Sequence, residues 1–95
     1  MNKIEELVKI GDYYTRINDF PNAIKFLEKA NKLSKNNIKI LLYLAGAYRS
    51  LGKFDKSINL YYEIIKLDHK NTIAHRLISS LTNYKKNKEH LFKME

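Results

Sequence analysis

Histidine and serine side chains are the residues of this chain whose types and spacing could support catalysis or metal binding. The spacing of His69, His75 and His90 matches no metal-ligand pattern on a helix. Ser79 and Ser80 lie about one helical turn from His75, where a histidine could act as a base toward a nucleophile. Neither an oxyanion hole nor an orienting acid accompanies this group. We therefore predict no catalytic and no metal-binding residue.

The glycines do not form a phosphate-binding loop. The chain has three, Gly11, Gly46 and Gly52, and they are far apart. A phosphate loop instead gathers its glycines within a few residues, so that backbone N–H groups can surround the anion. The sequence predicts a protein that is not an enzyme and that binds no cofactor.

The net charge of +8 limits the kinds of partner. A basic chain attracts nucleic acid, anionic membranes or acidic proteins. Only three of the 18 basic residues are arginines, and the longest basic run is Lys85-Lys86. Nucleic-acid sites depend on arginine forks and stacked aromatic rings, so we predict no specific nucleic-acid site. An acidic peptide or protein is consistent with the charge.

Composition also predicts a cellular location. The chain has no cysteine, which fits a reducing compartment. Its first residues are not a secretory signal, and its apolar runs are far too short to span a bilayer. We predict a soluble cytoplasmic protein that does not bind membranes.

Two blocks of sequence, 4–37 and 38–71, have equal length and align end to end without a gap. Eight of the aligned pairs are identical, namely Ile4/Ile38, Leu7/Leu41, Tyr14/Tyr48, Phe20/Phe54, Ile24/Ile58, Lys32/Lys66, Leu33/Leu67 and Asn37/Asn71. A fixed period of about 34 residues predicts a solenoid in which each unit buries its apolar face against a neighbour.

Apolar residues recur at helical spacing through both blocks and the tail. Helices are expected from near Lys3 to the break at Asn18, over 21–34, 38–51 and 55–67, and from Asn71 or Thr72 onward. Pro21 suits a first helical turn, and Gly52 can take the left-handed conformation that ends a helix. No strand-like alternation occurs, so the fold is predicted to be all-α with five helices.

Two helices and a short turn in each block resemble the tetratricopeptide repeat. The family's turn signature appears as Leu51-Gly52-Lys53-Phe54, and its mid-helix tyrosine as Tyr14 and Tyr48. The resemblance implies a right-handed helical-hairpin solenoid in one domain, residues 1–95. Repeat one would span 4–37, repeat two 38–71 and a capping helix 72–95. Ile64 departs from the family's preferred alanine, which predicts looser or different packing against the last helix.

In tetratricopeptide repeats the first helix of each unit lines a concave groove that binds a peptide or a partner helix. The resemblance therefore implies a partner-binding set on this face, namely Lys39, Leu42, Tyr43, Arg49 and Arg76. Tyrosine with two arginines favours a peptide that carries acidic groups. The family's clamp for C-terminal carboxylates is absent, because its five positions hold Val8, Asp12, Tyr43, Ile73 and Leu77.

Two alternatives to a non-catalytic interaction module stay open. The first is a structural module that forms a homodimer through Leu91 and Phe92, an apolar pair near the end of the last helix. The second is a detached portion of a sulfotransferase-type enzyme. The stretch 74–91 resembles the junction at which bacterial tetratricopeptide arrays run into a sulfotransferase-like domain.

Overall fold

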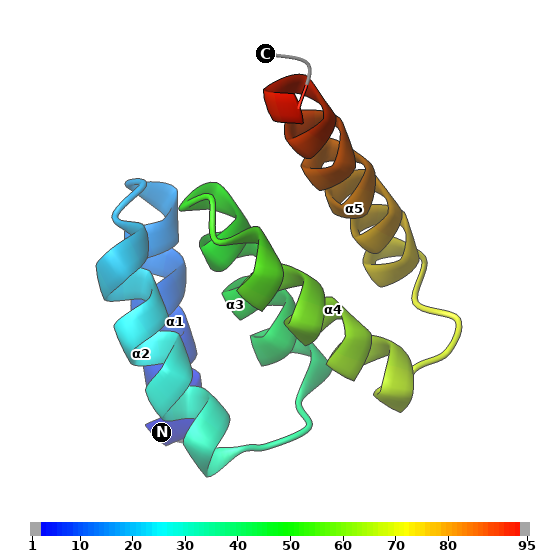
Figure 1. The fold of residues 1–95 in the computed structure, drawn as a ribbon. Coiled ribbons are helices and arrows are strands. Elements are labelled where there is room, and N and C mark those ends of the chain that lie inside the picture. The colour runs from blue at the N-terminus through cyan, green and yellow to red at the C-terminus, as the bar shows by residue number, and fades with distance from the viewer. Residues whose placement is uncertain (1–2, 94–95) are drawn as a thin grey trace.

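The computed structural model describes the backbone of residues 3–93 and the side chains of residues 3–84. Within this range the chain forms five helices and no strand. They are α1 (Lys3–Arg16), α2 (Phe20–Leu33), α3 (Ile38–Ser50), α4 (Phe54–Leu67) and α5 (Thr72–Lys93). Two helical hairpins stand side by side, and α5 follows them (Figure 1). The all-α helical repeat is confirmed. Below, unit one means α1 with α2, and unit two means α3 with α4.

Short polar side chains begin three of these helices. Asp19 lies just before α2, which has Pro21 in its first turn, and its carboxylate accepts a hydrogen bond from the backbone amide of Asn22 at 3.4 Å. Asn37 accepts from the Ile40 amide at 3.4 Å, and Asn71 accepts from the Ala74 amide at 3.0 Å. Each bond satisfies an amide that has no partner inside its own helix. The repeated Asn37/Asn71 pair therefore starts the helix that follows each unit.

The turn inside each unit has the same left-handed backbone conformation, but a different residue adopts it. Gly52 has φ +79° and Asn18, at the equivalent position, has φ +62°. Asparagine tolerates this left-handed conformation better than most residues with a side chain. Past these residues, the Asp19 amide donates to the Tyr14 carbonyl at 2.8 Å and the Lys53 amide to the Tyr48 carbonyl at 2.9 Å. The prediction for Gly52 is confirmed.

Small residues allow the two helices of each unit to approach closely. A Cβ atom added to Gly11 would lie 2.6 Å from Cγ of Leu27, so α1 and α2 meet there without room for a methyl group. In unit two, the buried Ser57 hydroxyl donates to the Ala45 carbonyl at 2.8 Å. That bond joins α4 to α3. It also gives the buried hydroxyl a partner, and a buried polar group without a partner destabilises the folded state.

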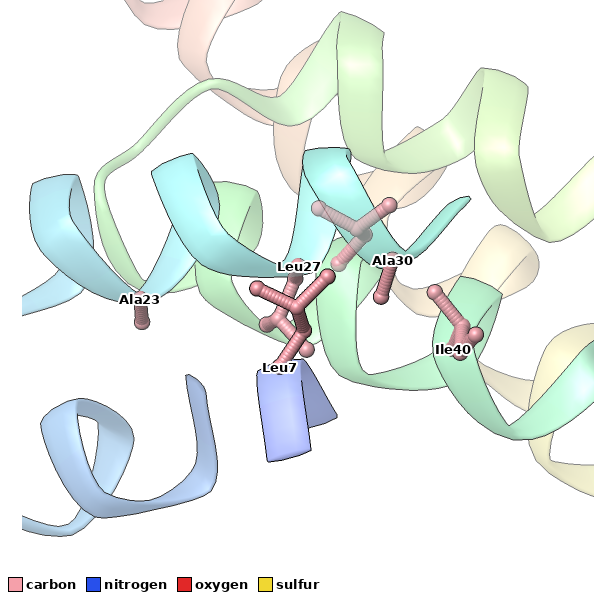
Figure 2. Packing of buried hydrophobic residues seen from close by; sticks show 6 residues of the cluster. Leu7, Ala23, Leu27, Ala30 and Ile40 are labelled. Atoms are coloured by element: carbon pink, nitrogen blue, oxygen red, sulfur yellow. The ribbon is translucent and has the colours of Figure 1, made fainter. Parts of the chain in front are cut away.

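Two buried clusters hold the helices together. The first consists of Leu7, Ala23, Leu27, Ala30, Ile40 and Leu44, and it joins unit one to α3. The second consists of Leu41, Ala45, Tyr61, Ile64, Ala74 and Leu81, and it joins unit two to α5. Figure 2 shows the side chains of Leu7, Leu27 and Ala30 directed into the interior shared with Ile40. Each unit thus buries its apolar face against the next element, as a repeat fold requires.

The last helix packs on α4 and then continues past it. The Phe54 ring, at the start of α4, meets the Tyr84 ring edge-on, with 5.2 Å between ring centres. The backbone of α5 stays helical beyond this contact and is unbroken at Asn87. None of the helices in the described part of the chain has the length and apolar character needed to cross a membrane.

Candidate binding surface on the inner helix faces

Three of the five predicted binding residues line one pocket. Lys39, Leu42 and Tyr43 surround a shallow hollow of about 280 Å³ on α3. Residues three and four positions apart lie on the same helix face, which explains why they meet. Tyr43 also packs against the first core cluster and Leu42 against the second. The floor of the pocket is therefore held by both halves of the core, while Lys39 stands exposed at its edge.

A second pocket adjoins the first. It lies between α1 and the start of α3, has a similar volume of about 280 Å³, and is lined by Ile4, Glu5, Val8, Lys9, Asn37, Lys39 and Ile40. Lys39 belongs to both pockets. Two ammonium groups and one carboxylate therefore border two small apolar hollows.

Arg49 occupies a different environment. It is exposed in the last turn of α3, beyond Tyr43. Burial raises the pKa of the Tyr61 hydroxyl, and the charge of Arg49 and a hydrogen bond with Ser57 each lower it in part. Arg49 therefore acts electrostatically on the α3–α4 core next to it, besides facing solvent.

Arg76 is exposed near the start of α5. Its neighbour Leu77 packs against the second core cluster, as Leu42 does. Neither Arg76 nor Arg49 lines the two pockets described above. The structure thus groups Lys39, Leu42 and Tyr43 closely and leaves the two arginines as separate exposed cations, Arg49 on α3 and Arg76 on α5.

Three polar side chains of α1, those of Asp12, Thr15 and Arg16, have partners within their own helix. Arg16 pairs with Asp12 at 3.0 Å between Nε and Oδ2, one turn apart. The Thr15 hydroxyl donates to the Gly11 carbonyl at 2.8 Å. An exposed pair of this kind contributes little to stability, but it partly neutralises Asp12. The Asp12 carboxylate, which by itself would repel an acidic ligand, is therefore held beside the Arg16 guanidinium.

One of the groups considered for catalysis, His75, has a structural partner. The His75 ring nitrogen Nε2 lies 2.8 Å from the His69 carbonyl, which ties the start of α5 to the preceding turn. Among the described residues, no three histidine, cysteine or acidic side chains gather closely enough to hold a metal ion. The side chains of Leu91 and Phe92 lie outside the described residues, so the predicted dimer contact through them stays a prediction.

Sequence reasoning misses the contribution of Ile4 and Asn37 to the second pocket. It predicts only a turn at Asn37, although the identity of Asn37 with Asn71 one repeat later could have indicated a shared structural role. It also misses a larger hollow, of about 540 Å³, between the ends of α2 and α4 and the start of α3. That hollow is lined by Asn31, Lys35, Asn36, Leu41, Glu63, Lys66 and Leu67.

Comparison with known proteins identifies the repeat. The sequence model of the tetratricopeptide repeat family matches residues 18–81, about two thirds of the chain. The chain belongs to the tetratricopeptide repeat family. Tetratricopeptide repeats generally mediate protein–protein interaction and are typically non-catalytic. A search of curated proteins found no match, and the resemblance to a sulfotransferase-linked junction stays a prediction.

Proposed function

We propose that this tetratricopeptide protein is a non-catalytic interaction module that binds an acidic peptide along the inner faces of α1, α3 and α5. The observation that carries the proposal is the pair of adjoining pockets that share Lys39. Leu42 and Tyr43 provide apolar contact on a floor fixed by the core, and Tyr is a residue type that often dominates binding energy. Residues 1–95 would act as one domain in this role.

The charge around the pockets supports an acidic ligand. Lys9 and Lys39 border the hollows, and Arg49 and Arg76 extend the positive charge along α3 and α5. Glu5 is the acidic residue that lines the pocket between α1 and α3. A peptide with an apolar side chain next to carboxylates would place the apolar side chain in a pocket and the carboxylates near the ammonium groups. Such binding weakens with salt, because ionic screening shortens the reach of exposed charges.

A displayed library of random peptides tests the proposal without knowledge of the natural partner. Immobilised protein is expected to enrich peptides that combine an apolar residue with Asp or Glu. Lys39→Glu and Tyr43→Ala are expected to weaken binding of the enriched peptides at least about tenfold, which corresponds to the loss of a strong contact.

The matched control is Lys32→Glu, which reverses an exposed lysine on the outer helix α2. It makes the same change in net charge as Lys39→Glu and leaves the pockets intact. Equal weakening by both variants would reduce the effect to overall charge and contradict the proposed site. Selection of peptides without acidic residues would contradict the proposed ligand class.

A further inference from the structure

An apolar seam runs along an exposed side of α1. Ile10, Tyr13 and Ile17 are 37%, 59% and 53% exposed, and they follow one another at intervals of three and four positions. Lys3 and Glu6 continue the same spacing toward the start of the helix. Alternating intervals of three and four place side chains in one line along a helix, as in the seam of a coiled coil. The α1 seam below means Ile10, Tyr13 and Ile17.

In unit two, the equivalent residues of α3 are covered by packing. In the alignment of the two repeats, Ile10 and Tyr13 correspond to Leu44 and Ala47 of α3. These two residues are only 0% and 1% exposed, because unit one lies against them. Leu44 belongs to the first core cluster together with residues of α2. At Leu44 and Ala47, α3 is thus a helix-packing surface, and Ile10 and Tyr13 are its exposed counterparts. Leu51, the counterpart of Ile17, follows α3 and is itself 40% exposed.

The α1 seam is not shaped for another hairpin like unit one. Where α3 carries the small Ala47, α1 carries Tyr13, whose ring would obstruct a helix that approached as closely as α2 approaches α3. Tyr13 meets the Tyr14 ring edge-on at 5.3 Å, and Tyr14 stacks on Phe26 at 5.7 Å. The phenol ring is therefore braced in place, and it suits a partner helix that also contributes large side chains.

We propose that the α1 seam binds the α1 seam of a second copy of this chain, with the two helices antiparallel. In this arrangement Ile10 of each copy packs against Tyr13 of the other, and Ile17 packs on the aliphatic part of the other copy's Glu6. Such a two-fold contact uses one surface on both copies and closes on itself. Tyrosine is enriched at interfaces of this kind.

The charges at the ends of α1 favour the same orientation. The first turn carries Glu5 and Glu6, and the last turn carries Arg16. In the antiparallel pair Arg16 of one copy lies beside Glu6 of the other. Arg16 also pairs with Asp12 of its own helix through Nε, and its guanidinium has further N–H donors for a second carboxylate. The helix dipoles oppose each other, so unlike charges meet at both ends. A parallel pair would set like charges together.

Sedimentation equilibrium of the full chain from micromolar to millimolar concentration tests the proposal. The parent is expected to form dimers, and Tyr13→Ser/Ile17→Ser is expected to raise the dimer dissociation constant more than about tenfold, as for residues that anchor an interface. Tyr62→Ser is the matched control, because Tyr62 is a similarly exposed tyrosine (52%) on the outer helix α4. A parent that stays monomeric overturns the proposal, as does equal weakening by the control.

Charge reversal tests the orientation. Glu6→Lys and Arg16→Glu are each expected to weaken the dimer severalfold, and the double variant is expected to restore most of the loss, because the unlike charges then meet again with exchanged signs. Additive weakening in the double variant would overturn the antiparallel arrangement. Loss of the dimer in Leu91→Ser/Phe92→Ser, with Tyr13→Ser/Ile17→Ser unchanged, would overturn the α1 seam in favour of the last helix.

Discussion

The junction between unit one and unit two and the junction between unit two and α5 place large and small side chains in opposite order. At the first junction, α2 contributes Ala30 and α3 contributes Ile40 to one buried cluster. At the second, the equivalent positions hold Ile64 on α4 and Ala74 on α5. All four side chains are at most 1% exposed. The isoleucine and the alanine have exchanged helices.

This exchange shows how a repeat can vary without losing its interior. Protein cores tolerate substitution best when the total volume is kept, and each junction holds one isoleucine and one alanine. The neighbouring contacts do differ. In the described part of the chain α1 touches α3, whereas α5 packs against α4 without a comparable backbone contact to α3 (Figure 1).

The largest effect that tests this comparison is expected at Ile64. Ile64→Ala removes a fully buried side chain and leaves a cavity beside an alanine, at a cost of about 2–5 kcal/mol in the free energy of unfolding. Ala74→Ile overpacks the same junction and costs about 1–3 kcal/mol. The double variant restores the arrangement of the first junction and is expected to recover much of both losses. Urea unfolding followed by circular dichroism measures all three.

The control for this cycle is the first junction itself. Ala30→Ile with Ile40→Ala would give α2 and α3 the arrangement now found between α4 and α5, and partial recovery is expected there as well. If the free energies of the single variants simply add at either junction, the two side chains do not share space. The volume exchange would then not explain the departure at Ile64.

Most of the fold could be predicted from the sequence because its signals are local. Pro21 and Gly52 mark helix ends by their own backbone chemistry, and both act as predicted. The sequence leaves Asn71 and Thr72 as candidates for the start of the last helix, and Asn71 is the one whose side chain caps it. The sequence also marks Ile64 as a departure, but its compensating Ala74 lies outside the two aligned blocks. Sequence reasoning therefore predicts looser or different packing there without deciding between the two. The packing is different rather than looser, because Ile64 is fully buried in one cluster with Ala74.

The site was predictable to the extent that it lies on one helix. Lys39, Leu42 and Tyr43 meet because helical spacing alone brings them to one face. Arg49 lies farther along the same helix, beyond Tyr43. The separation of Arg76 from this pocket depends instead on how α5 packs against α4, which sequence spacing does not specify. Ile4 and Asn37 join the site from other elements for the same reason.

A smaller effect is expected where the two units differ at their closest internal approach. Gly11 faces Leu27 in unit one, and the equivalent pair in unit two is Ala45 with Tyr61. Gly11→Ala forces a methyl group against Leu27 and costs about 1–3 kcal/mol, offset by up to about 1 kcal/mol of helix propensity. Thermal and urea unfolding measure the net loss.

Gly46→Ala is the matched control for Gly11→Ala. It also lies inside a helix, but a Cβ atom there meets nothing within 4 Å. Without a clash, the better helix propensity of alanine is expected to stabilise the protein by up to about 1 kcal/mol. If both variants destabilise the protein, the loss in Gly11→Ala cannot be assigned to the clash with Leu27. The close approach of α1 and α2 at Gly11 would then not distinguish this position from the open one at Gly46.

The smallest effect distinguishes the junctions by pH. Burial raises the pKa of Tyr61 at the second junction; at the first, burial and then the nearby Glu28 carboxylate raise the pKa of Tyr48. The unfolded chain therefore loses these protons first, near the ordinary tyrosine value of about 10. The folded state binds more of these protons above that pH, so the contribution of the two tyrosines to stability is constant below it and falls as the pH rises further.

Tyr61→Phe and Tyr48→Phe are each expected to reduce this alkaline loss of stability. The reduction is expected to be larger for Tyr61, which is only 1% exposed, than for the half-buried Tyr48. Tyr61→Phe also removes a polar group from a buried position. That change acts equally at every pH, so the slope is the quantity to compare. Urea unfolding at a series of pH values from about 8 to about 11 brackets the titration. A slope unchanged by Tyr61→Phe would mean that the second junction already opens enough for water to reach the hydroxyl, making it the weaker of the two.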